Sequence, residues 1–154
     1  MTQRTFDIPS ALALFAIAVF TSLTGAHAAD SVNTTRRGVA IEGYDPVSYF
    51  TDGAPVAGQK DLTFAWNGAT WRFSSVEHRD LFAAAPERYA PQFGGYCAWA
   101  VAHGKTAGID PEAWKIVEGR LYLNYSRKIQ RRWEEDIEGN IARAEGHWPS
   151  LVDD

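Results

Sequence analysis

A single cysteine and four histidines are the residues of this 154-residue chain best suited to chemistry. Cys97 follows Gly94-Gly95 and lies in the first turn of an apolar helix predicted from about Tyr96 to His103. There the unpaired N–H groups and the positive end of the helix dipole favour a thiolate over a thiol. The position predicts a nucleophile or a soft-metal ligand. It also allows a cysteine that only packs, because free cysteine is among the most buried residue types.

Two histidines are candidate partners for this thiol. His103 lies about 240° from Cys97 on an ideal helix, so the two share a site only if the helix ends early, which a following glycine favours. His78 is predicted in the first turn of another helix, where Ser74 and Glu77 have the spacing of a capping box. The metal-ligating candidates are therefore Cys97, His103 and His78. The alternatives are a histidine at a helix C-terminus and a surface histidine.

The segments that position these residues predict an α+β fold. Asn67-Gly68 separates two aromatic segments and is the dipeptide that a type I′ hairpin turn favours. Glu118-Gly119 separates a second pair, and helical segments follow both. We expect a small domain of two β-hairpins packed with three to four helices, without a βαβ crossover.

Residues 1–28 are predicted to be a secretory signal peptide. The segment Ile8–Leu23 is almost entirely apolar or small, and Ala26-His27-Ala28 supplies small residues for cleavage. The apolar run is shorter than the ~20 residues needed to span a bilayer, although a short membrane anchor is the alternative. We expect residues 29–41 to be a flexible entry segment and residues 42–150 a single domain. The expected location is periplasmic or secreted, with no stable membrane insertion after cleavage.

Composition narrows the classes of function. At 45% hydrophobic and 22% charged residues the chain is neither disordered nor fibrous. Its net charge of −4 and lack of a basic run give no support for nucleic-acid binding. One cysteine excludes an internal disulfide, a CxxC redox pair and a multi-cysteine zinc site.

Two parts of the chain resemble a known family. Residues 42–90 resemble a YHS domain, on Asp45-Pro46-Val47, Trp71-Arg72-Phe73-Ser74-Ser75, His78, Phe82, Pro86 and Tyr89. The extension, residues 91–150, resembles the exported YHS domain-containing (seleno)protein group, on Gly94-Gly95-Tyr96-Cys97-Ala98-Trp99-Ala100, Asp110-Pro111-Glu112-Ala113-Trp114 and Leu121-Tyr122-Leu123-Asn124-Tyr125. The resemblance implies soft-metal binding through cysteines, because YHS modules accompany copper-transporting ATPases. It also implies thiol or selenol chemistry, because some exported members carry selenocysteine at the position matching Cys97.

The chain departs from the cysteine-bearing YHS pattern at three positions. Ser48, Ser74 and His78 stand where those modules have cysteine. Soft monovalent metals prefer thiolates, and a serine hydroxyl is a poor substitute. Of the three positions, only His78 therefore keeps a side chain that could bind a metal.

Three hypotheses follow. The first is a binding module for Cu(I), another soft metal or a small ligand, centred on Cys97. The second is a redox protein in which Cys97 is the catalytic residue and an external protein is the reductant, since the chain has no resolving cysteine. The third is a non-catalytic accessory or interaction domain with a protein partner. An enzyme is the less favoured class, and the exposure of Cys97 discriminates between the hypotheses.

Overall fold

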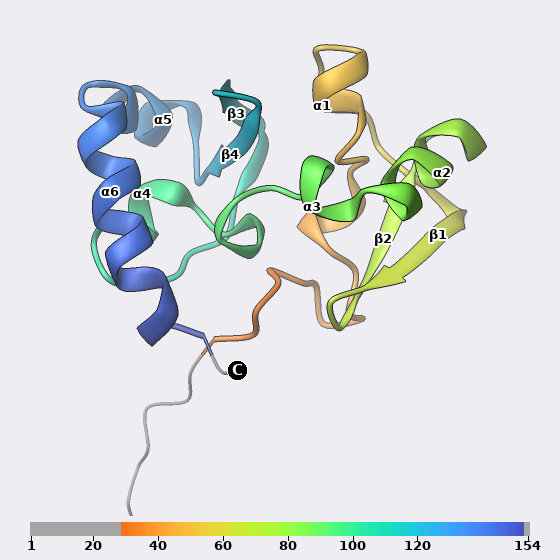
Figure 1. Ribbon diagram of the computed structural model, residues 1–154, viewed down its shortest axis with the longest axis horizontal. Helices are drawn as coiled ribbons and strands as arrows, with labels where there is room; N and C mark the ends of the chain where they lie inside the picture. The colour runs from red at the N-terminus through yellow and green to blue at the C-terminus, as the bar shows by residue number, and fades with distance from the viewer. Residues whose placement is uncertain (1–28, 153–154) are drawn as a thin grey trace, which may run out of the picture.

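The computed structural model describes residues 29–152, so the predicted signal peptide lies outside the described residues. Within them the chain forms helices and two antiparallel hairpins (Figure 1), with these bounds: η1 Ile41–Gly43, α1 Ser48–Thr51, β1 Gln59–Trp66, β2 Ala69–Phe73, α2 Val76–Ala84, α3 Pro86–Tyr89, η2 Phe93–Gly95, α4 Ala98–Ala102, β3 Asp110–Val117, β4 Arg120–Asn124, α5 Arg127–Glu134, α6 Ile137–His147, η3 Trp148–Ser150. The α+β class and both hairpins are confirmed. The described part of the chain has six α-helices rather than three to four, because α1 and α3 are separate pieces of four residues.

Both hairpin turns have the backbone that the sequence predicts. Asn67 and Gly68 have φ of 49° and 73°, and Glu118 and Gly119 have the same pair of values. Positive φ at both turn residues defines type I′, whose twist matches that of the flanking strands. Glutamate tolerates this region less well than asparagine, yet the second turn is equally tight.

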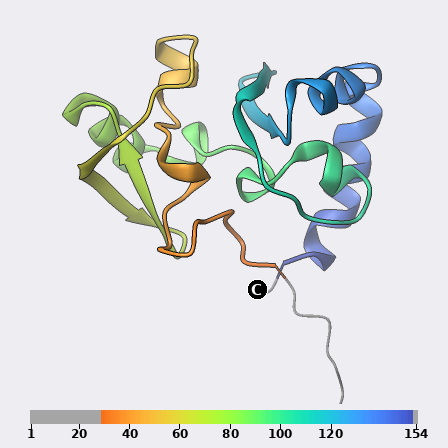
Figure 2. The ribbon, with the colours of Figure 1, turned by 180° about the vertical axis from the view of Figure 1, so that it is seen from behind.

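The two halves of the chain repeat one hairpin-and-helix unit. Adding 51 to each partner in Thr63↔Arg72 gives Trp114↔Leu123, and the other strand pairs shift by the same number. Each hairpin has one irregularity at the same point of its first strand. Each is followed by a helix, α2 or α5, capped by a serine. The fold therefore contains an internal repeat (Figures 1 and 2).

Two helix starts differ from the predicted ones. The cap of α2 is Ser75, whose hydroxyl accepts the N–H of His78 at 3.1 Å, rather than Ser74. Helix α4 is shorter than predicted, so Cys97 is its N-cap residue and His103 its C-cap residue. Cys97 therefore lies before the first turn of α4, not within it.

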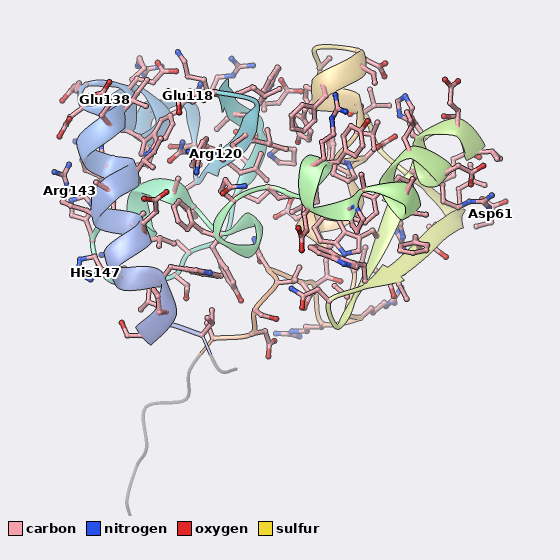
Figure 3. The ribbon with its side chains drawn as sticks, in the orientation of Figure 1. Asp61, Glu118, Arg120, Glu138, Arg143 and His147 are labelled. Atoms are coloured by element: carbon pink, nitrogen blue, oxygen red, sulfur yellow. The ribbon has the colours of Figure 1, made fainter. Side chains whose placement is uncertain are left out.

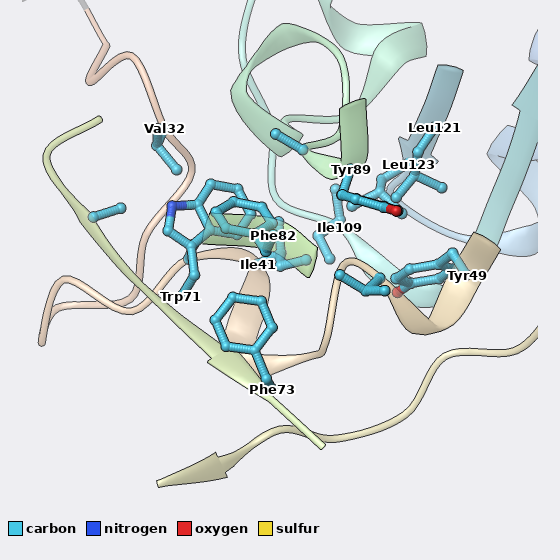
Figure 4. Packing of buried hydrophobic residues seen from close by; sticks show 14 of the residues in the cluster. Val32, Ile41, Tyr49, Trp71, Phe73, Phe82, Tyr89, Ile109, Leu121 and Leu123 are labelled. Carbon is cyan, nitrogen blue, oxygen red and sulfur yellow. The ribbon is translucent and has the colours of Figure 1, made fainter. Parts of the chain in front are cut away.

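The main core lies between the two halves. Trp71, Phe73 and Phe82 from the first half belong to one buried cluster with Leu121 and Leu123 from β4 (Figure 4). A second cluster lies under α6 and joins it to α4, η2, β4 and α5, through Phe93, Ala98, Val101, Ala102, Tyr122, Trp133 and Ala144. The shared core fixes the halves against each other, so each half can present residues in a defined position.

The segment of residues 29–41, predicted to be flexible, is held against the domain. Val32 is buried, and the N–H of Asn33 donates to the carbonyl of Gly94 at 2.9 Å. The N–H of Ala29 donates to the carbonyl of Leu151, so the two ends of the described chain lie side by side (Figure 1). The sequence pattern missed this because the segment is polar and the contacts that hold it to the domain come from residues far along the chain, such as Gly94 and Leu151.

Exposed ion pairs connect β4 to α6 and α6 to its own N-cap residue in the second half. Arg120 at the start of β4 reaches Glu145 on α6 at 3.4 Å, and Arg143 on the outer side of α6 reaches Asp136 at 3.0 Å (Figure 3). Exposed pairs of this kind contribute little to stability. Within residues 29–152 no helix is both long and apolar enough to cross a membrane.

Candidate functional site

A buried carboxylate organises the polar cluster of the first half. Asp45 is fully buried and follows Tyr44, the C-cap residue of η1. Its Oδ1 accepts the N–H of Val47 at 2.9 Å. Its Oδ2 accepts the N–H and the hydroxyl of Ser74 at 2.8 and 2.7 Å, and lies 2.6 Å from Nδ1 of His78. Four donors satisfy the carboxylate, which joins the loop before α1 to the end of β2 and to α2.

His78 is oriented by this carboxylate. The side chain is 12% exposed. Because a carboxylate accepts hydrogen bonds, the proton between the two groups is on Nδ1 of the imidazole. The opposite ring nitrogen, Nε2, faces Thr51 Oγ1 at 3.1 Å and Asp52 Oδ1 at 3.9 Å. The ring therefore has one edge fixed in the interior and one edge turned toward exposed residues of α1 and its C-cap.

Ser48, Ser74 and His78 all form hydrogen bonds with Asp45. The Ser48 hydroxyl donates to the Asp45 carbonyl at 2.8 Å and accepts the N–H of Val56 at 3.2 Å. Ser74 and His78 bind the Asp45 carboxylate. Both hydroxyls are used within the protein and no thiolate is present, so this cluster does not fit Cu(I). An imidazole beside a carboxylate instead suits zinc, copper(II) or nickel.

Cys97 is a buried thiol. It is 1% exposed, its sulfur accepts the N–H of Tyr125 at 3.3 Å, and it lies 3.7 Å from Oδ1 of the buried Asn124. Burial raises the pKa of the Cys97 thiol, while backbone N–H groups of Ala100, Tyr125 and Trp99 act in the opposite direction with smaller effect. The predicted lowering of this pKa by the helix is therefore outweighed by desolvation.

His103 lies at the far end of α4. Its Nδ1 is 2.7 Å from the carbonyl of Trp99, and its ring lies against the Trp99 indole with 4.3 Å between centroids. This exposed histidine fits the helix C-terminal interpretation. Its hydrogen bond is not to Cys97, and His78 lies in the other half on α2 (Figure 1). The structure thus brings together neither the two histidines nor the thiol with His78.

Asp45 and Cys97 occupy equivalent places in the repeat. Each follows a 3₁₀ turn with positive φ, and their backbone N–H groups donate to the carbonyls of Val56 and Ala107 respectively. Their side chains also accept from corresponding backbone groups, the N–H of Ser74 and the N–H of Tyr125. One scaffold therefore holds a carboxylate in the first half and a thiol in the second.

Sequence reasoning did not identify Asp45, Thr51 or Asp52 as site residues. Asp45-Pro46 is a common turn signal, and nothing local distinguishes a turn aspartate from a buried acceptor. The partners of Asp45 at Ser74 and His78 lie 29 and 33 residues away. The only signal in the sequence is that Asp45, Ser74 and His78 were all among the residues that carry the resemblance described above.

The clusters of possible metal ligands are small. Among residues 29–152 no group of three or more His, Cys, Asp or Glu side chains is placed to hold a metal ion. His78 and Asp52 could therefore supply two ligands, with the other coordination positions filled from outside this part of the chain. Comparison with protein-family models, curated proteins and solved structures finds no match to this chain.

Proposed function

We propose that this protein is an exported, non-enzymatic binding module of the YHS type that takes a divalent transition-metal ion at Nε2 of His78. The observation that carries the proposal is the 2.6 Å hydrogen bond from His78 Nδ1 to the buried Asp45. Metal-ligating histidines almost always donate their other N–H to a carboxylate or carbonyl, which fixes the ring and raises its basicity. The periplasmic or secreted location is part of the proposal and depends on residues 1–28.

The groups around Nε2 complete the argument for a divalent ion. Asp52 lies 3.9 Å from Nε2 and is partly exposed. The Thr51 hydroxyl between them lies 2.9 Å from Asp52 and 3.1 Å from His78. When an ion is bound, His78 would supply a nitrogen ligand and Asp52 an oxygen ligand, while Asp45 keeps the imidazole in its orientation. A two-ligand site binds more weakly than a full cage of protein ligands, which suits uptake and release.

Titration calorimetry with Zn²⁺, Ni²⁺ and Cu²⁺ tests this site. We expect one ion per chain, loss of binding in His78→Gln, and a 10- to 100-fold weaker affinity when Asp45 is replaced by asparagine, in line with other carboxylates behind a histidine ligand. His103→Gln is the matched control, because His103 is an exposed histidine outside the cluster. Wild-type affinity in His78→Gln, or equal loss in His103→Gln, would contradict the proposal.

A second candidate function is thiol chemistry at Cys97. Backbone N–H groups of Ala100, Tyr125 and Trp99 favour the ionised form of the sulfur, but burial has the larger effect and raises the pKa of the thiol. Reaction at Cys97 therefore requires a local opening that exposes the sulfur. In a redox cycle a hydroperoxide would convert the thiol to a sulfenic acid and leave as an alcohol or water. A first external thiol would then form a mixed disulfide and release water, and a second would restore the Cys97 thiol and leave as the external disulfide. Ag⁺ titration and sulfenic-acid trapping of wild type and Cys97→Ser test the soft-metal and redox forms. If neither residue binds or reacts, the accessory domain is the remaining hypothesis.

A further inference from the structure

We propose that an open pocket in the first half, separate from the His78 cluster, binds a phosphate-type anion. The pocket has a volume of about 320 Å³ and lies between the turn at residues 35–39, the η1 segment and the β1–β2 hairpin. Its charged lining residues are Arg36, Arg37, Lys60 and Arg72, with Glu42 as the only carboxylate among them.

The charge of this pocket is opposite to that of the whole protein. Four cationic side chains face one carboxylate there, whereas the chain carries a net charge of −4. Several cations elsewhere on the surface, such as Arg79, Lys115 and Arg143, lie within 4 Å of a carboxylate. Among residues 29–152, none of the four pocket cations has an ion-pair partner at that distance. A local excess of positive charge concentrates anions at the surface.

Arg72 is the most constrained of the four. Its Nε is buried and has no hydrogen-bond partner within the described part of the chain. The backbone at Gly58 and Gly43 packs closely against its side chain. A Cβ added at Gly58 would lie 2.5 Å from the Arg72 Cβ, and one added at Gly43 would lie 3.3 Å from a guanidinium nitrogen. A buried donor without an acceptor is rare and marks a place where an ion or water belongs.

The two neighbouring arginines are presented by a closed turn. The N–H of Thr35 donates to the carbonyl of Val39 at 2.9 Å, and the N–H of Gly38 donates to the carbonyl of Thr35 at 2.8 Å. The Thr35 hydroxyl accepts the N–H groups of Arg37 and Val39, both at 3.3 Å. Arg36 and Arg37 are therefore exposed on a backbone that is already folded for binding, which lowers the entropic cost.

These features select the class of ligand. Guanidinium groups bind phosphate and carboxylate through paired N–H donors, and Arg is the residue typical of phosphate recognition. The excess of three positive charges favours a group that carries more than one negative charge. The ligand is thus a phosphate or phosphate ester, which could be a free solute or the headgroup of an anionic phospholipid.

Two binding measurements at low ionic strength test the site. Calorimetric titration with inorganic phosphate reports a free anion, and co-sedimentation with vesicles of phosphatidylcholine, with or without phosphatidylglycerol, reports a lipid headgroup. In whichever assay the wild type binds, we expect Arg36→Gln/Arg37→Gln to weaken binding at least tenfold. Arg72→Lys, which keeps the charge and loses the fork, should weaken it several-fold.

The matched control is Arg131→Gln/Arg132→Gln, a second pair of exposed neighbouring arginines, on α5. It removes the same charge and should leave binding unchanged. Binding in only the phosphate or only the vesicle assay identifies the source of the anion. The proposal is overturned if the wild type binds in neither assay, if Arg36→Gln/Arg37→Gln binds like the wild type, or if the control loses as much affinity. Both double variants alter exposed side chains, and equal thermal midpoints verify that they fold.

Discussion

Replacing Asp45 by alanine should be among the most destabilising single substitutions in the first half. The fully buried carboxylate accepts four hydrogen bonds, two from backbone N–H groups, one from a hydroxyl and one from His78. Each buried donor left without a partner costs about 1–3 kcal/mol. Because His78 can turn toward solvent and water can reach Ser74, we expect a loss of about 3–5 kcal/mol. The total free energy of unfolding of a folded domain is about 5–15 kcal/mol, so this loss would be a large part of it.

Urea unfolding followed by tryptophan fluorescence measures this loss, since Trp71 is buried in the core beside β1. The control is Asp136→Ala, which removes another aspartate that accepts a backbone N–H, from Gly139, and contacts an arginine. Asp136 is exposed, so water replaces its partners and the expected change in the unfolding midpoint is far smaller. A loss below about 1 kcal/mol for Asp45→Ala, or an equal loss in the control, would refute the buried-acceptor interpretation.

Three further predictions concern the thiol, a phenol and a turn. Folded protein should resist iodoacetamide at neutral pH until urea unfolds it, because Cys97 is buried and its pKa is raised by desolvation; fast labelling would contradict its burial. Burial also raises the pKa of the Tyr49 hydroxyl, which donates to the Pro111 carbonyl. The folded state keeps this proton where the unfolded state loses it, so stability should fall as pH rises above about 10. Tyr49→Phe should make that fall shallower in urea midpoints measured from pH 8 to 11. Asn67→Val places a branched residue at φ 49° and should cost about 1 kcal/mol or more, whereas Asn67→Gly should not; equal unfolding midpoints for the two would be contrary to the strain argument.

Local rules were enough to predict the hairpins. Asn67-Gly68 favours positive φ at both turn positions, Glu118-Gly119 marks a second turn of poorer type I′ sequence, and the aromatic segments beside the first turn alternate with a period of two. These signals need only a few neighbouring residues, and the structure has both turns with the expected backbone. The α+β class followed from the same signals, because in each hairpin the two strands are joined by a tight turn and not by a helical crossover.

The same local rules did not predict features that depend on contacts between residues far apart in the sequence. Ser74 and Ser75 are adjacent and equally suited to cap α2, so the sequence alone does not choose between them. The choice is made by Asp45, which takes the hydroxyl and the N–H of Ser74 and leaves Ser75 to cap the helix. The environment of Cys97 was likewise set by Asn124 and Tyr125, which lie 27 and 28 residues later.

The internal repeat shows why the two halves should differ in function. In the first half the acceptor is a carboxylate, and His78 on the following helix donates to it. The position 51 residues after His78 is Ile129, so an ionised Cys97 would have no cation from that helix and only backbone dipoles to hold it. A charge without a counterion is costly in a buried place, which keeps the thiol neutral. The first half therefore holds a carboxylate–imidazole pair whose outer edge faces exposed residues of α1, whereas the second half holds a thiol in the same arrangement with no side-chain donor from the following helix. Binding chemistry that needs an oriented polar group accordingly belongs to the His78 side of the molecule.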